Sequence, residues 1–145
     1  MKTLLIVTAV LEAATGLGLA LAPALTVFML FGAPLDAPAG LLVGRVAGAA
    51  LLSLGLACWL AQHDAQSRAA QGLVTAMLFY NIAAVTAFVY AGIGLGLSGS
   101  GIWPAALVHM ALAVWCTACL WSARIHARIG RIDACIAYYH LWMKK

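Results

Sequence analysis

Charged residues are scarce in this 145-residue chain, and acidic residues are the scarcest. Lysine and arginine together number 8 and aspartate and glutamate 4, so 8% of the chain is charged. A soluble globular domain carries about 25% charged residues, so this sequence cannot cover a water-facing surface. With a mean hydropathy of +1.04, most of the folded surface is expected to face lipid.

Cysteine and proline are also few, with four of each. Four cysteines, three of them inside apolar runs, do not form the disulfide framework of a small secreted domain. The net charge of +4 does not indicate nucleic-acid binding, because the basic residues other than Arg45 lie beside or between apolar runs. That placement is typical of topology signals and lipid-headgroup contacts.

The long apolar runs are the main positive signal. About 20 apolar residues are needed to cross a bilayer core as a helix. Four runs meet this length, at roughly Thr3–Leu21, Gly40–Ala61, Gly72–Leu95 and Ile102–Ser122. The sequence therefore predicts an all-α integral membrane four-helix bundle over residues 1–122, with Leu25–Phe31 as a short outer interfacial segment.

The last part of the chain, residues 123–145, has a different pattern. Isoleucines recur there every three or four residues and arginines flank them, which predicts a basic amphipathic helix on the inner leaflet. Docking of this tail on a partner subunit is the alternative. The expected partner is thus the lipid bilayer, with other membrane subunits or a homo-oligomer as further candidates, and no nucleic acid is expected.

The basic residues also predict the orientation of the chain. Lys2, Arg68 and the charges of the tail fall on one side of a four-span arrangement, whereas FGAPLDAPAG and GLSGSG on the other side hold no lysine or arginine. By the positive-inside rule, both termini are expected in the cytoplasm, in a bacterial-type inner (plasma) membrane.

Each predicted span contains one strongly polar residue at a comparable depth: Glu12, Arg45, Asn81 and His109. A charge at a span centre costs about 2.5–3.5 kcal/mol on insertion scales, so a buried Glu12–Arg45 ion pair is expected. Glycines at positions 40, 44 and 48 would permit close helix approach. The cluster has two interpretations: a structural pair with interhelical hydrogen bonds, or a site for a small ligand, an anion or a proton.

The cysteines offer a second candidate site. Cys116 and Cys119 have the CxxC spacing, and Cys58 is expected at a similar depth. Three thiols at one level could bind a soft metal such as Cu(I) or Hg(II) or serve thiol-redox chemistry, although cysteines in apolar spans also act as packing residues. A haem or metal bridge between His63 and His126 is a further alternative, and the cofactor remains open.

The segments LEAATGLGLALAP and GRVAGAALLSLGLACWLA resemble the DoxX-like group of small bacterial four-helix membrane proteins. The resemblance covers the four spans and not the tail. It implies the same architecture and suggests links to quinone or thiol redox systems, but supplies no catalytic residue.

The sequence thus favours a non-catalytic membrane protein over an enzyme. It would be an accessory subunit or a small-ligand-binding bundle built around Glu12, Arg45, Asn81 and His109. The alternatives are a small oligomeric transporter, or a thiol-redox or soft-metal-handling protein that uses Cys58, Cys116 and Cys119.

Overall fold

The computed structural model describes the backbone of residues 1–143, and within the tail it leaves the side chains of residues 127, 130, 131 and 133–142 undescribed. Over the described backbone the chain is helical, without a strand. The elements in order are α1 (Lys2–Leu21), α2 (Pro23–Phe31), α3 (Pro38–Ala61), the short 3₁₀ helix η1 (Gln62–Asp64), α4 (Arg68–Val89), the π-helical turn η2 (Tyr90–Gly94) and α5 (Ile102–Trp142).

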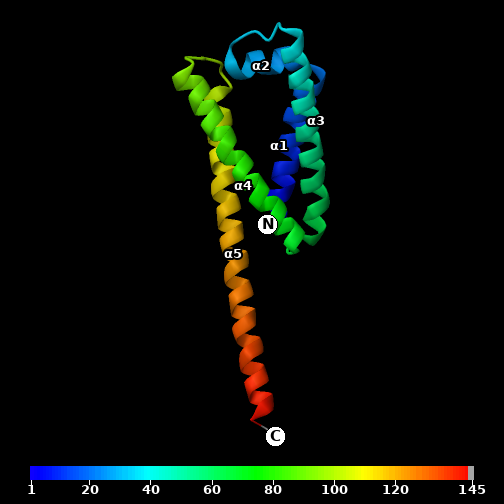
Figure 1. Ribbon diagram of the computed structural model, residues 1–145, viewed down its shortest axis with the longest axis vertical. Coiled ribbons are helices and arrows are strands. Elements are labelled where there is room, and N and C mark those ends of the chain that lie inside the picture. Colours follow the sequence, from blue (N-terminus) through cyan, green and yellow to red (C-terminus); the bar gives the residue numbers. More distant parts are fainter. Residues whose placement is uncertain (144–145) are drawn as a thin grey trace.

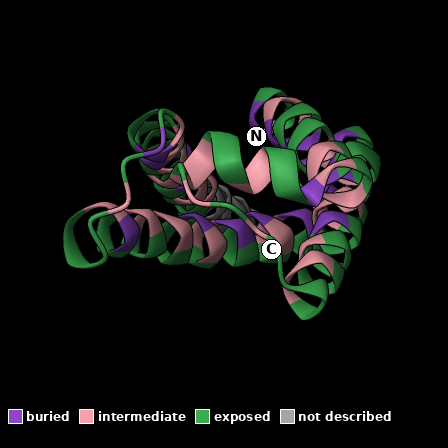
Figure 2. Cartoon of the chain, turned by 90° about the horizontal axis from the view of Figure 1, so that it is seen from above, coloured by how far each residue is buried: buried purple, intermediate pink, exposed green. Residues whose placement is uncertain are grey.

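Four segments are long and apolar enough to cross a membrane: Lys2–Leu21, Pro38–Asp64, Arg68–Gly94 and Ile102–His126. They confirm the four predicted apolar helices. Large apolar side chains point outward from them, such as Val10 (57% exposed), Phe79 (71%) and Val114 (66%). Exposed residues cover the outer side of each helix when the molecule is seen from above (Figure 2). A surface of this kind suits lipid, because soluble monomers rarely expose large contiguous apolar patches.

Prolines and a glycine set the ends of the short helix α2. Pro23 and Pro38 stand at the first turns of α2 and α3, where the missing backbone N–H is tolerated. Gly32 ends α2 in the left-handed conformation, with φ +70°, which a residue with a Cβ adopts only with strain. The short helix expected between the first two spans is therefore present, and it lies across one end of the molecule (Figure 1).

The long helices form two pairs (Figure 1). Helix α1 packs along α3 and helix α4 along α5. In the first pair the backbones touch at glycines: a Cβ at Gly48 would lie 2.5 Å from the amide nitrogen of Ala20 and 2.7 Å from the carbonyl oxygen of Gly16. The expectation that glycines bring α3 close to a neighbour is confirmed at Gly48.

The two pairs meet in an apolar core near the start of α1. Its buried members come from α1, α3, α4 and α5: Leu4, Leu5, Ala9, Cys58, Val74, Met77, Leu112 and Cys116. Toward α2 the pairs diverge (Figure 1). The candidate site lies between the two pairs at this end.

Backbone contacts hold helix α2 over the end of the bundle where the two helix pairs diverge. The Gly101 amide donates to the Met29 carbonyl at 3.1 Å, and Gly99 lies so close to the backbone of Leu30 that no side chain would fit on it. The loop between η2 and α5 thus holds α2 in place.

Helix α5 continues without a break past Ser122, the predicted end of the fourth span, as far as Trp142. At ~1.5 Å per residue, its 41 residues extend about 60 Å, roughly twice the thickness of a bilayer core. The predicted tail helix is therefore the second half of α5. Its contact with the inner leaflet stays a prediction.

Candidate functional site

Glu12 is the buried acid of the bundle. It lies on the third turn of α1 and is 3% exposed. Its hydrogen-bond partner is the hydroxyl of Tyr80 on α4, which donates to Glu12 Oε2 at 3.4 Å. Such a bond is long, since O–H···O bonds are usually about 2.7–2.8 Å. A carboxylate has about four acceptor positions, so Glu12 retains the capacity to bind another donor.

The predicted buried ion pair between Glu12 and Arg45 is wrong, because Arg45 is exposed. The reason is the register of α3 against α1. A Cβ at Gly55 would lie 3.5 Å from Glu12 Cβ, so Glu12 is level with Gly55, ten residues from Arg45. At ~1.5 Å per residue, the two charged residues are separated by about 15 Å along the helix axis, and Arg45 does not belong to the site.

Asn81 and His109 are brought together as expected. Asn81 on α4 is fully buried; its Nδ2 donates to the Met77 carbonyl at 2.7 Å, and its Oδ1 lies 2.7 Å from His109 Nδ1 on α5. Because an amide oxygen can only accept, Nδ1 must carry the hydrogen of this bond. Asn81 therefore fixes the tautomer of a neutral His109 and leaves its Nε2 as an acceptor.

Two aromatic rings contact His109, and a third stacks on one of them. The Phe88 ring stacks on the imidazole with centroids 5.7 Å apart, and Tyr80 meets it edge-on at 5.5 Å. Phe31 from α2 stacks in turn on Phe88 at 5.7 Å. These contacts link α2, α4 and α5, so α2 helps to orient the histidine.

Glu12, Tyr80 and His109 line one cavity of about 310 Å³ between the two helix pairs. The rest of its wall is mostly apolar and comes from α1, α2 and the beginning of α5: Leu11, Thr15, Leu30, Gly101, Pro104, Ala105, Val108 and Leu112. A mostly apolar cavity with a few convergent polar groups is typical of small-molecule sites, and its volume is at the lower end of their range.

The polar groups of this cavity share one property: they accept hydrogen bonds. An ionised Glu12 has only acceptors, and His109 Nε2 is an acceptor once Asn81 holds the hydrogen on Nδ1. The Tyr80 hydroxyl already donates to Glu12. The cavity is thus suited to a molecule that brings hydrogen-bond donors and a flat apolar part.

Tyr80 is the site residue that the sequence analysis missed. Its signal is a phenol in the interior of an apolar run, next to Asn81. A buried tyrosine hydroxyl usually has a hydrogen-bond partner. Tyr80 could therefore have been predicted to bond to Glu12, the only acid within another apolar run.

The cysteines belong mainly to the core. Cys58 and Cys116 are fully buried and share one apolar cluster, and Cys119 packs against it. All three are free thiols. Over the part of the chain that the structure describes, no three His, Cys, Asp or Glu side chains are placed to hold a metal. The predicted set of Cys58, Cys116 and Cys119 is therefore not arranged as a metal site.

The two histidines considered for a haem bridge both lie on the surface. His63 is an exposed residue of η1. His126 is exposed on α5, where its Nδ1 donates to the Ser122 carbonyl at 2.8 Å. Neither position supports a haem bridge between the two histidines, and this alternative stays a prediction.

Comparison with known proteins gives no match to a family model, to a curated protein or to a solved structure. The resemblance to the DoxX-like group thus stays a prediction.

Proposed function

We propose that this chain is a non-catalytic multi-pass membrane protein that binds a small lipophilic molecule with hydrogen-bond donors. A lipophilic amine, protonated in the site, fits the cavity best. The observation that carries the proposal is that Glu12 and His109 present acceptors to one mostly apolar cavity.

Charge favours an amine over an alcohol or phenol. Glu12 is buried and its hydrogen bond to Tyr80 is long. In a low-dielectric site, an ionised carboxylate is stabilised strongly by a cation and weakly by a neutral donor. Tyr80, whose hydroxyl donates to this carboxylate, also lines the cavity, and aromatic rings attract ammonium groups.

The test is binding of phenethylammonium to the purified protein in detergent micelles, measured by isothermal titration calorimetry. We expect one molecule per chain. Glu12→Gln should weaken binding by about 10- to 100-fold, which corresponds to the roughly 1.5–3 kcal/mol of a hydrogen bond to a charged group. Thermal unfolding of the variant shows whether it remains folded.

Two controls make this test specific. Arg45→Gln, which alters the other charged residue of the predicted cluster, should leave affinity unchanged because Arg45 is exposed away from the cavity. Ethylbenzene has a similar shape without a donor and should not compete. Equal binding by wild type and a folded Glu12→Gln variant would contradict the proposal, as would effective competition by ethylbenzene.

We further propose that the end of the bundle that carries Met1 faces the cytoplasm. In support, residues from the starts of α1 and α4 and from the middle of α5 line one cavity at that end, including Met1, Gln71 and Ser122. Lys2, Arg68 and Arg124 are near these residues in sequence, whereas Asp36 lies in the connection between α2 and α3 at the other end. This distribution agrees with the positive-inside rule for an inner (plasma) membrane.

A further inference from the structure

A second cavity, of about 620 Å³, lies at the end of the bundle where α1 begins. It is separate from the Glu12 cavity and shares no lining residue with it. The start of α1, the connection before α4, α4 itself and α5 contribute its wall: Met1, Gln66, Gln71, Trp115, Ala118, Cys119, Ser122, Ala123 and His126. No carboxylate is among these residues.

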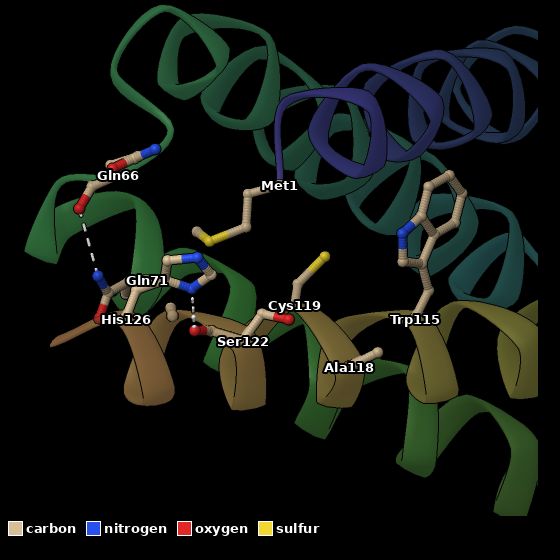
Figure 3. Close-up of a pocket in the computed structure, with 9 residues that line it drawn as sticks. Met1, Gln66, Gln71, Trp115, Ala118, Cys119, Ser122 and His126 are labelled. Carbon is tan, nitrogen blue, oxygen red and sulfur yellow. Dashed lines mark hydrogen bonds between the residues drawn. The ribbon is translucent and has the colours of Figure 1, made fainter. Parts of the chain in front are cut away.

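Three of the lining residues carry soft or borderline metal ligands. They are the thioether of Met1, the thiol of Cys119 and the imidazole of His126, drawn as sticks around the cavity in Figure 3. Cys119 and His126 are seven residues apart, so they share one face of α5 at two helical turns, with Cα atoms about 10 Å apart.

The His126 side chain is oriented back toward Cys119. Its Nδ1 donates to the Ser122 carbonyl at 2.8 Å, one turn closer to Cys119. This bond places the hydrogen on Nδ1 and leaves Nε2 free as a ligand atom. A hydrogen bond from the other ring nitrogen to a backbone carbonyl is the usual arrangement for a metal-binding histidine, because it fixes the ring and its tautomer.

We propose that Met1 Sδ, Cys119 Sγ and His126 Nε2 form a site for a soft monovalent metal ion, Cu(I) in the first place. Thiolate and thioether ligands select Cu(I) over harder cations, and imidazole also suits copper. This set differs from the three cysteines considered from the sequence: it keeps Cys119 and replaces the two fully buried thiols, Cys58 and Cys116, with two groups at the cavity wall. The proposal is independent of amine binding in the Glu12 cavity.

The physical chemistry of the cavity agrees with this ion. Cys119 loses its proton to water when copper binds, so Cys119–SH and Cu⁺ give Cys119–S–Cu and H⁺, and copper remains in the +1 state. The Cu(I)–thiolate unit is neutral, so it introduces no net charge beside the apolar core that Cys119 packs against. Met1 has three rotatable side-chain bonds and can adjust to the ion within a cavity of this volume.

Anaerobic titration of the full-length protein with Cu(I), in competition with bathocuproine disulfonate, tests the site. We expect one Cu(I) per chain and at least about tenfold weaker binding in Cys119→Ser and His126→Ala, since loss of even an outer-shell partner costs 10- to 100-fold. His63→Ala is the matched control, because His63 is an exposed histidine outside the lining. Cys116→Ala is the corresponding control for the thiol, and thermal unfolding shows that each variant is folded.

X-ray absorption at the copper edge tests for the methionine ligand. In selenomethionine-labelled protein, with Met1 verified by intact mass, we expect copper–selenium scattering. Absence of that scattering would remove Met1 from the site. Absence of stoichiometric Cu(I) binding, full binding in folded Cys119→Ser, or a loss confined to Cys116→Ala would overturn the proposal as a whole.

Discussion

The closest approach of α1 and α3 makes Gly48→Ala the sharpest test of the fold. A Cβ there would lie 2.5 Å from the Ala20 amide nitrogen and 2.7 Å from the Gly16 carbonyl oxygen. Both obstructing atoms belong to the backbone, so no side-chain rotation can relieve the contact. The two helices would have to move apart.

The expected cost follows from two opposing terms. Overpacking a well-packed interior costs about 1–3 kcal/mol, and a contact with backbone belongs near the upper limit. Replacing glycine by alanine inside a helix gains about 1 kcal/mol. We therefore expect Gly48→Ala to lower the free energy of unfolding by about 2 kcal/mol. Gly72→Ala is the matched control, because a Cβ at Gly72 meets nothing within 4 Å, and it should be neutral or stabilising by up to about 1 kcal/mol.

Unfolding by sodium dodecyl sulfate in mixed micelles, followed by circular dichroism, measures both variants against wild type. The two should differ by about 3 kcal/mol, which is the overpacking term once the shared gain in helix propensity cancels. If Gly48→Ala is as stable as Gly72→Ala, then α1 and α3 do not meet at this glycine, and the register that places Glu12 beside Gly55 is wrong as well.

Three further predictions concern the site and the orientation. Arg45→Gln should change the free energy of unfolding by no more than about 0.5 kcal/mol, the usual range for an exposed residue; a large loss in the same detergent assay would mean that Arg45 has a buried partner. Asn81→Leu should lower it by about 1–3 kcal/mol, because His109 Nδ1 loses its acceptor, and should weaken phenethylammonium binding in calorimetry. A reporter that works only in the cytoplasm should be active when fused after Lys145 and inactive when inserted beside Asp36, and the reverse result would invert the orientation.

The helices could be predicted largely from the apolar runs. The first two spans were placed within two residues of α1 and α3 at each end, because charged residues and prolines bound those runs. The unbroken continuation of α5 past Ser122 was not predicted. The sequence becomes more polar after Ser122, but nothing in residues 123–129 interrupts a helix. The change from an apolar to a polar sequence was therefore interpreted as the end of one helix and the start of another.

The site could be predicted in part. Asn81 and His109 came together because a polar side chain in an apolar span needs a partner. The position of Arg45 failed because depth alone does not give helix rotation or register. Gly48 occupies the face of α3 that touches α1, and Arg45 lies three residues earlier, about 60° away around a helix of 3.6 residues per turn. Which residues of α3 touch α1 depends on how the two helices pack against each other, and the sequence of one helix alone does not show it.

Helix α2 covers one end of the Glu12 cavity, and this affects how a molecule reaches Glu12. Leu30 and Gly101 cover the outer end of the cavity, and the apolar core beneath it contains Leu112. The wall also includes Leu11 on α1 and Val108 on α5, whose side chains are 37% and 43% exposed. In the proposed bilayer arrangement these two side chains would face the acyl chains, and the proposed ligand would enter sideways from the membrane. Its occupancy is then governed by how strongly it partitions into lipid, and compounds of equal affinity but different oil–water distribution would fill the site to different extents.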